Sequence, residues 1–361
     1  MLGVVLVWSA AASDAGSGGG SALAQRHALS VGIAVLLAYV VSRMSYNAVR
    51  VSAPWVYVVS VVATAVTLTP LGSSVAGAQA WIALPGGFTV QPSEFAKAAM
   101  VVAVAAYVAE RVPRGQDPGF WLCTRAAILA AVPITLVLLQ NDTGTVLVMG
   151  GTALTMILVA GAPLRWILAS GAILAVAVIA VVELGLLQEY QVDRLTAFTD
   201  PDADRQGAGF NTDQALIAIG GGGIVGHGLF QGPQTQGSFV PVHESDFVFT
   251  VAAEELGLVG SWLVIALLAV VLVRGLLIAA RAQDRFGRLV PIGIVAWFAI
   301  QSFENIGMSL GIMPVTGVPL PFVSFGGSSM MACWIAVGLL QLIQIRTVRG
   351  HYHRTSAAAS A

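Results

Sequence analysis

The hydrophobic positions of this chain fall in long blocks rather than in alternation. Blocks of about 20 apolar residues, the length of helix that crosses a bilayer, are separated by shorter polar connections. Ten blocks are visible, at 1–10, 28–46, 55–71, 94–111, 121–139, 143–160, 164–185, 247–279, 289–310 and 323–346. The pattern predicts an all-α polytopic membrane protein with about ten transmembrane helices, because a β-barrel would show short alternating segments instead.

Two blocks differ from the usual length. The first covers only residues 1–10, which would span about 15 Å as a helix, so we expect a partial first transmembrane helix. The block at 247–279 would be close to 50 Å long as one straight helix, at about 1.5 Å per residue. We therefore expect part of this block to tilt, break or protrude.

Composition supports a membrane protein and excludes other classes. Hydrophobic residues make up 57% of the chain and charged residues 10%, whereas soluble domains carry about 25% charged residues. A net charge of -1 suggests no nucleic-acid partner, and the two cysteines, Cys123 and Cys333, suggest neither a metal site nor a disulfide framework. We predict a single membrane domain over 1–361, with a large hydrophilic loop at 186–246 and a tail at 347–361.

The distribution of arginines predicts how the chain is oriented. On one side of the predicted membrane lie Arg43, Arg50, Arg111, Arg114, Arg125, Arg165, Arg274, Arg281, Arg285, Arg288, Arg346, Arg349 and Arg354. The other side holds only Arg26, Arg194 and Arg205. The positive-inside rule makes the first side cytoplasmic. We therefore expect the C-terminus inside a plasma membrane and the loop at 186–246 outside it.

The long loop is not uniformly polar. It contains an apolar stretch at 215–219, followed by glycines at 220–223, 226 and 228. This pattern predicts a segment that packs on the membrane surface or folds into the protein. The glycine run lacks the ending of a phosphate-binding P-loop, so we expect its glycines to permit tight turns or close backbone approach.

Glu94 and Lys97 are charged residues at the start of an apolar block. Three residues apart, they share a helix face and can pair, and Ser93 is a candidate N-cap of that helix. Lys97 is the only lysine in the chain. A charge within the membrane is costly, which favours a polar cavity around Lys97. The alternative is a purely structural ion pair.

Other carboxylates stand where apolar blocks begin. Asp246 precedes the block at 247–279, so it is either a helix N-cap or a general base whose pKa is raised in an outward-open cleft. Asp142 precedes the block at 143–160 and suits an N-cap. Glu254 and Glu255 follow Asp246 within its block, where a structural hydrogen-bonding role competes with a place in the site.

The segment from 304 to 329 combines polar residues with prolines and glycines. Glu304 and Asn305 lie inside the block at 289–310, three prolines occur within 314–321, and Ser324 and Ser328 follow. Irregular backbone at membrane depth is tolerated where it lines a cavity or is buried in protein. An ordinary connecting turn is the alternative.

Taken together, these motifs resemble the SEDS family (shape, elongation, division and sporulation), and most closely its RodA-like branch. The similarity covers nearly the whole chain. It includes QPSEFAK at 91–97, IAIG at 217–220, GHGL at 226–229, SDFVF at 245–249, EELG at 254–257 and NIGM at 305–308. The stretch PVTGVPLPFVSFGGSS at 314–329 is the most specific of them.

The resemblance implies a peptidoglycan glycosyltransferase that polymerises lipid II on the outer face of the plasma membrane. By it, Asp246 is the catalytic carboxylate, and Glu94 and Lys97 belong to the substrate cavity. We add Glu254, Asp142, Asn305, Ser324 and Ser328 to the expected cavity residues. The implied reaction inverts the anomeric carbon, with a divalent cation as a possible support for the leaving group. The implied partner is a class B penicillin-binding protein.

Three motifs depart from the family pattern. Ala80 stands before Trp81 where the family usually has arginine, so one cavity cation is missing. Asn141 replaces the proline of the family's QPDLGT motif. Ahead of Asp246, Val242 and Glu244 occupy the places of the usual glutamate and histidine. These differences concern substrate contacts more than the reaction.

Two other functions compete with polymerisation. A lipid II flippase would also use polytopic helices and intramembrane charges, but we find no internal repeat, and Asp246 lies at a membrane boundary. A non-catalytic activator of a penicillin-binding protein is the third possibility. The loss of arginine at Ala80 favours an activator, whereas the presence of Asp246, Glu94 and Lys97 opposes it.

Overall fold

The computed structural model describes residues 1–12, 19–75, 77–84, 88–113, 115–183, 185, 192, 196, 198, 208–237, 239 and 244–359. Part of the predicted loop at 186–246 lies outside these residues, including Arg194, Arg205, Val242 and His243, as does Arg114. The described helices are α1 (Leu2–Ala12), α2 (Gly19–Arg43), α3 (Tyr46–Val66), α4 (Pro92–Arg111), α5 (Phe120–Leu139), α6 (Thr143–Val159), α7 (Leu164–Glu183), α9 (Ala208–Gly222), α10 (Pro233–Gln236), α11 (Val248–Arg281), α12 (Arg285–Ser309) and α13 (Gly327–Ala359).

The ten predicted blocks correspond to ten apolar helices. Within the described residues, eight helices are long and apolar enough to cross a membrane, and α1 and α6 are shorter apolar helices. The prediction of a helical, multi-pass membrane protein is confirmed. The boundary of α3 was wrong: it begins at Tyr46, capped by the Ser45 hydroxyl, and includes Pro54. The prediction from hydropathy began that helix at residue 55, whereas its first turns contain the polar residues Asn47, Arg50 and Ser52.

The chain divides into two compact units. Unit 1 consists of Met1–Ser30, Ile167–Ala269 and Gln301–Gly326, and unit 2 consists of Val31–Trp166, Val270–Ile300 and Gly327–Ala361. In unit 1, α1 packs against the start of α11, where Leu6, Val248 and Phe249 share one hydrophobic cluster. The prediction of a single domain over 1–361 stays a prediction.

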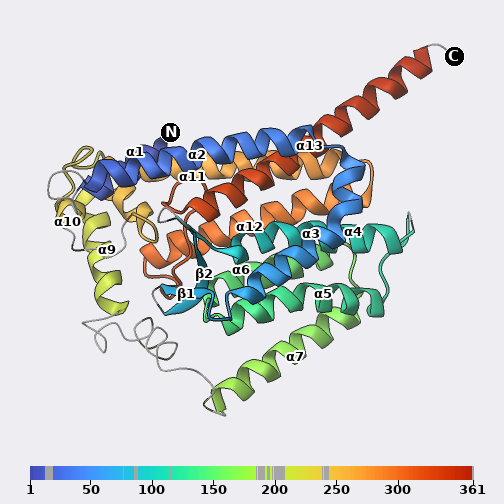
Figure 1. Cartoon of the computed structure of the whole chain (residues 1–361), viewed down its shortest axis with the longest axis horizontal. Coiled ribbons are helices and arrows are strands. Elements are labelled where there is room, and N and C mark those ends of the chain that lie inside the picture. Colours follow the sequence, from blue (N-terminus) through green and yellow to red (C-terminus); the bar gives the residue numbers. More distant parts are fainter. Residues whose placement is uncertain are drawn as a thin grey trace. The chain divides into compact units, whose positions relative to one another are not determined.

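Helix α4 is the buried centre of unit 2. Neighbouring helices α3, α4, α5 and α6 lie side by side (Figure 1). In the most apolar window of α4, 83% of residues are buried, against 28% in the windows of α3 and α5. Side chains from every side of α4 therefore meet protein, and a polar residue on this helix needs a polar partner.

A small sheet between α3 and α4 was not predicted. Strands β1 (Gly72–Val75), β2 (Ala78–Leu84) and β3 (Phe88–Val90) form an antiparallel sheet in the order β1-β2-β3. Ser73 pairs with Trp81 and Ile82 with Val90. Ala80, which replaces the family arginine, lies in β2 and is fully buried. The sheet leads directly into the polar start of α4.

Helix α11 is broken at Gly257, which is one of the three outcomes (tilt, break or protrusion) that the length of its block predicted. Gly257 has φ 66° and ψ -162°, a conformation that is essentially restricted to glycine. A Cβ at this position would lie 2.4 Å from the Gly226 nitrogen. The break therefore depends both on the backbone freedom of glycine and on its lack of a side chain.

The glycine-rich segment after α9 fills the break through main-chain hydrogen bonds. The amides of Leu258 and Val259 donate to the carbonyls of Gly223 and Ile224 at 2.9 and 3.2 Å. In return, the amides at positions 227 and 228 donate to the carbonyls of residues 254 and 255 at 3.1 and 2.9 Å. The predicted role of these glycines in close backbone approach is confirmed, since Cβ atoms at positions 222 and 226 would lie 2.1 and 2.2 Å from carbonyl oxygens of α11.

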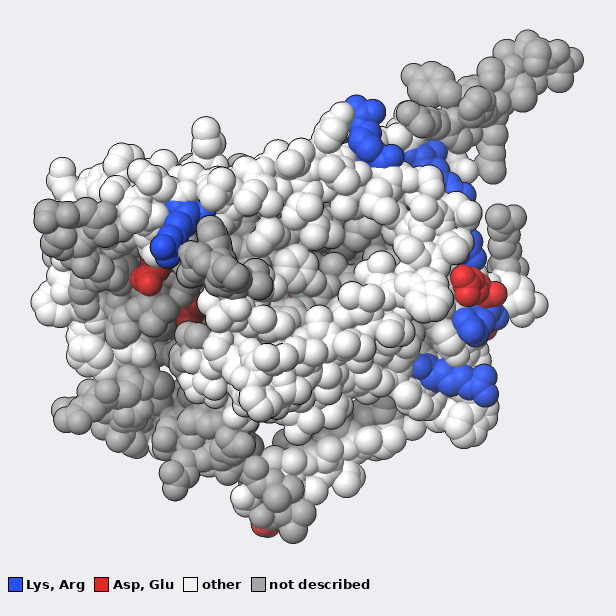
Figure 2. All heavy atoms as spheres, in the orientation of Figure 1, with Lys and Arg blue, Asp and Glu red and all other residues white. Residues whose placement is uncertain are grey.

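The arginines of unit 2 gather at helix ends. Arg43 ends α2, Arg111 ends α4 and Arg281 ends α11. Arg285 begins α12, immediately after the turn that follows α11. Figure 2 shows blue side chains close to the end of α4, on the face that it draws. Consecutive helices therefore bring their basic ends to the same end of unit 2.

Candidate functional site

The first turns of α4 carry a buried ion pair. The Lys97 ammonium contacts the Glu94 carboxylate at 2.8 Å, and each side chain is only 1% exposed. Lys97 Nζ also lies 5.1 Å from the centre of the Trp297 ring of α12, within the range of a cation–π contact. Glu94 Oε2 is buried without a hydrogen-bond partner in the described part of the chain. The predicted pairing of Glu94 and Lys97 is confirmed.

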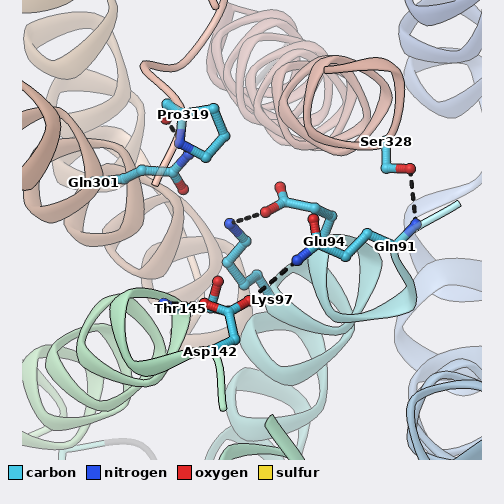
Figure 3. Close-up of polar contacts among 8 residues, drawn as sticks. All are labelled: Gln91, Glu94, Lys97, Asp142, Thr145, Gln301, Pro319 and Ser328. Atoms are coloured by element: carbon cyan, nitrogen blue, oxygen red, sulfur yellow. Dashed lines mark hydrogen bonds and ion pairs between the residues drawn. The ribbon is translucent and has the colours of Figure 1, made fainter. Parts of the chain in front are cut away.

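Gln91 connects this pair to two other elements of unit 2. Its side-chain amide donates to Asp142 Oδ2 at 3.1 Å, and its backbone N–H donates to the Ser328 hydroxyl at 2.9 Å. Figure 3 shows the side chains of Gln91, Glu94 and Lys97 leaving the start of α4, with Gln91 reaching Asp142. Glu94, Lys97, Asp142 and Ser328, all predicted site residues, therefore form one polar cluster.

The N-cap of α4 is Gln91 rather than Ser93. Pro92 occupies the start of the helix, so Ser93 lies inside the first turn and is fully buried. The prediction of Ser93 as the cap was wrong because proline is favoured at the first helical position, which moves the cap one residue before it. The role of Gln91 was missed, since glutamine is not among the preferred capping residues.

Asp142 caps α6, as predicted, and contributes to the cluster with its other oxygen. Its Oδ1 accepts from the Thr145 N–H at 3.0 Å while Oδ2 accepts from Gln91. Withdrawal from water raises the pKa of the Asp142 carboxyl, although the Thr145 hydrogen bond and the charge of Lys97 act in the opposite direction. The carboxyl of Asp142 therefore links the start of α6 to the charged start of α4.

In unit 1, Asp246 lies immediately before α11 and is partly exposed. The hydroxyl of Ser245 donates to Asp246 Oδ1 at 2.9 Å. The segment at 314–324, called the proline-containing segment below, approaches the carboxylate closely. A Cβ at Gly317 in this segment would lie 3.4 Å from Asp246 Oδ2. Gly317 has φ 73°, in the left-handed region that favours glycine.

Amide side chains of α12 hold the segment beside Asp246. Asn305 donates through Nδ2 to the backbone carbonyls of Asp246 and Val318 at 2.7 and 2.8 Å. One turn earlier, Gln301 donates to the Pro319 carbonyl at 2.7 Å (Figure 3). Asn305 therefore ties the start of α11 to the proline-containing segment, which was not evident from its position in the sequence.

The proline-containing segment is largely buried over 318–324 and is internally hydrogen-bonded. Ser324, a predicted cavity residue, accepts from the Leu320 N–H at 2.8 Å, and the Phe325 N–H donates to the Glu244 carbonyl at 2.9 Å. Val318 and Leu320 are each 1% exposed. Of the alternatives drawn from the sequence, the geometry favours irregular backbone buried in protein, with Ser324 serving the segment itself.

The carboxylate of Glu254 contacts α10. Its two oxygens accept from the Gln234 N–H at 2.6 Å and from the N–H and hydroxyl of Thr235 at 2.9 and 2.5 Å. The neighbouring Glu255 accepts from the Ser9 hydroxyl at 2.6 Å and the Phe230 N–H at 3.1 Å. The geometry favours the structural alternative for both residues, which anchor the segment between α9 and α11.

The remaining observation concerns metals. Among the described residues, no three His, Cys, Asp or Glu side chains are close enough together to hold a metal ion.

Two residues of α12 contribute to the site without having been predicted. Trp297 contacts Lys97, and Gln301 holds the proline-containing segment through Pro319. Both lie in an apolar block whose sequence gives no sign of which residues face inward.

Comparison with known proteins agrees with this architecture. A family model described as "Cell cycle protein", which groups FtsW, RodA and SpoVE, matches residues 1–348. Peptidoglycan glycosyltransferase MrdB of Escherichia coli (strain K12) is 34% identical over 358 residues, covering 99% of this chain and 91% of MrdB.

Solved structures show the same fold. One, described as "Structural coordination of polymerization and crosslinking by a peptidoglycan synthase complex", has a TM-score of 0.78 and 28% identity, covering 96% of each chain. The rod shape determining protein RodA of Thermus thermophilus has a TM-score of 0.68 and 27% identity, covering 95% of this chain and 92% of that one. The chain therefore belongs to the FtsW/RodA/SpoVE family, the SEDS family that its motifs indicated.

Proposed function

We propose that this protein polymerises lipid II into glycan strands at the outer face of the plasma membrane, with Asp246 as the general base. Family membership and relatives such as MrdB show that the protein is a peptidoglycan glycosyltransferase of the RodA type, acting in cell elongation. The substrate, the stereochemistry and the roles of individual residues are the new content of the proposal.

The observation that carries the proposal is the setting of Asp246. It is a partly exposed carboxylate at the start of a membrane-spanning helix, and Asn305 fixes its backbone at 2.7 Å. Helix α11 ends at Arg281, among the arginines of unit 2. The positive-inside rule supports a cytoplasmic location for that end and, with it, the proposed outward-facing position of Asp246.

In the proposed reaction, Asp246 accepts the proton of the GlcNAc 4-hydroxyl of one lipid-linked disaccharide. The oxygen attacks the anomeric carbon of the MurNAc of a second molecule and forms the new glycosidic bond. The bond from that carbon to the lipid pyrophosphate breaks on the opposite face, so the carbon is inverted. The pyrophosphate leaves with the electron pair, and the proton remains on Asp246 until it passes to water.

From the family resemblance, we further propose that the cluster on α4 contributes a cation to this leaving group. Lys97 is the only lysine in the chain and its ammonium is held by Glu94 at 2.8 Å. A fixed cation in a site of low dielectric stabilises developing negative charge far better than one in water. We assign Lys97 to the pyrophosphate, Glu94 to holding Lys97, and Asp142 and Ser328 to fixing Gln91 beside them. A divalent cation bound together with the substrate would add to the same effect.

A class B penicillin-binding protein is the proposed partner. The solved structure with a TM-score of 0.78 is described as a peptidoglycan synthase complex that coordinates polymerization and crosslinking. A polymerase of the same fold has the same need for an enzyme that cross-links its product. The experiment below therefore uses the protein purified together with its cognate penicillin-binding protein.

The test is glycan polymerisation from purified lipid II by this complex. Wild type and Glu110→Gln should both make long glycan chains, whereas Asp246→Asn and Asp246→Ala should lose activity by about a hundredfold or more, the usual contribution of a general base. Glu110 is a suitable control because it is an exposed carboxylate at the end of α4 with no role in the proposed reaction. Full activity of Asp246→Asn would refute the assignment of the base.

The same assay distinguishes the competing functions. If well-folded wild-type complex makes no glycan but moves lipid II across vesicle membranes, the flippase hypothesis is correct. If the complex makes no glycan and the penicillin-binding protein loses activity without this chain, the activator hypothesis is correct.

A further inference from the structure

A basic groove on unit 2 has no role in the proposed reaction. It lies between the last turns of α11 and the C-terminal half of α13. Its lining includes Arg274, Leu277, Ile278 and Arg281 from α11, with Gln344 and Thr347 from α13. The groove therefore combines two guanidinium groups, two uncharged hydrogen-bonding side chains and an apolar wall.

The helical spacing places both arginines on one face of α11. Positions 274, 277, 278 and 281 recur at the interval of a single helix face, and Arg274 and Arg281 stand about 10 Å apart along the axis. The neighbouring face is buried: a Cβ at Gly275 would lie 2.4 Å from the Val295 side chain, and Ala279 is 4% exposed. Arg274 and Arg281 are both exposed.

Within the described residues, no ion pair balances the charge of the groove. In the part of the chain that the structure describes, neither Arg274 nor Arg281 has an ion-pair or hydrogen-bond partner, and the lining contains no carboxylate. Other arginines at this end of unit 2 do have partners. Arg285 donates to the Gln116 carbonyl, and Arg346 pairs with Asp284 at 3.5 Å.

The position of the groove limits what can fill it. Both helices are long and apolar enough to span a membrane, so their exposed faces meet lipid. Arg274 stands about two turns inside the end of α11, where an unpaired cation is costly. Basic pockets between transmembrane helices on the cytoplasmic side suit anionic lipid head groups. An anionic phospholipid would bring phosphate oxygens to the arginines and an acyl chain to Leu277 and Ile278.

We propose that the groove between α11 and α13 binds the phosphate head group of an anionic phospholipid through Arg274 and Arg281. This binding site is separate from the proposed polymerisation site, since it lies at the opposite end of α11 from Asp246. Gln344 and Thr347 would complete the contacts to the head group from α13. The acyl chain would run along the apolar wall toward the bilayer centre.

The test is native mass spectrometry of the full chain, titrated with phosphatidylglycerol or with phosphatidylcholine of the same acyl chains. Wild type should retain phosphatidylglycerol in preference, by about thirtyfold if each arginine contributes about fivefold, as for basic residues near an anionic surface. Arg274→Gln/Arg281→Gln should lose this preference. Arg125→Gln should keep it, because Arg125 is an exposed arginine of α5 outside the groove.

Three results would overturn the proposal. One is an unchanged preference in Arg274→Gln/Arg281→Gln. Another is an equal loss in Arg125→Gln, which would indicate diffuse surface charge instead of a site. The third is displacement of the lipid by millimolar inorganic phosphate alone, which would identify a site for free phosphate. Arg274→Lys/Arg281→Lys, which keeps both charges, should retain most of the preference and separates loss of charge from loss of fold.

Discussion

The buried pair of Glu94 and Lys97 allows a quantitative test of whether charge on α4 serves the fold or the chemistry. Both side chains are 1% exposed and their charged atoms lie 2.8 Å apart. Glu94→Gln or Lys97→Met leaves one buried charge without its partner, which costs about 3–5 kcal/mol of unfolding free energy. The double variant leaves no charge of this pair, so it should be more stable than the sum of the single effects by about 2–3 kcal/mol.

An exposed pair on the same helix provides the control. Arg111 and Glu110 are 3.7 Å apart, with side chains 51% and 50% exposed. Water screens this pair, so the coupling between Glu110→Gln and Arg111→Met should be below about 1 kcal/mol.

Unfolding in detergent can be followed by maleimide labelling of the buried thiols of Cys123 and Cys333, which become accessible as the chain opens. Coupling for Glu94 and Lys97 no larger than that of the exposed control would refute the reasoning. Activity separates fold from chemistry: we expect the stable double variant to remain inactive because the leaving group has lost Lys97. A double variant that polymerises normally would make the pair purely structural.

Three further predictions concern residues that hold the backbone of unit 1 in place. Gly257→Ala should destabilise the protein by about 3 kcal/mol or more, measured as a fall in thermal unfolding temperature, whereas Gly220→Ala should be tolerated because a Cβ there meets nothing within 4 Å. Equal effects at the two glycines would contradict the proposed strain. Glu254→Ala should speed hydrogen exchange of the Thr235 amide by about a hundredfold, since about 2–3 kcal/mol of buried hydrogen bonding is lost; unchanged exchange would mean that Glu254 does not anchor α10. Asn305→Ala should lower polymerisation by about thirtyfold at unchanged expression, from two lost hydrogen bonds of about 1 kcal/mol each, and full activity would exclude a positioning role.

Much of the fold could be predicted from the sequence because a helix that crosses the membrane needs a long run of apolar residues. The ten blocks and the cap at Asp142 followed from local rules. The pairing of Glu94 with Lys97 followed from their spacing on one helix face. The length of the block at 247–279 predicted a tilt, a break or a protrusion, but the break at Gly257 depends on the distant segment that fills it.

The features that sequence reasoning missed are set by contacts between distant segments. Strands β1 to β3 are at most seven residues long, too short for alternation to stand out beside the apolar blocks. Glu254 was expected near substrate, yet its oxygens contact Gln234 and Thr235 because the intervening chain folds back on α11. Asn305 acts through two carbonyls that lie 59 and 13 residues away in sequence.

The junction between the glycine-rich segment and the broken helix α11 has a consequence for how this region tolerates mutation. Its four hydrogen bonds join main-chain atoms, two in each direction. These hydrogen bonds therefore depend little on which side chains the segment carries, except where a glycine is needed for space. Inserting or deleting one residue between Gly223 and Gly228, by contrast, would misalign donors and acceptors together. A deep mutational scan should find this segment permissive to substitution at Ile224 and Val225, which are 69% and 78% exposed, and intolerant of every change in length.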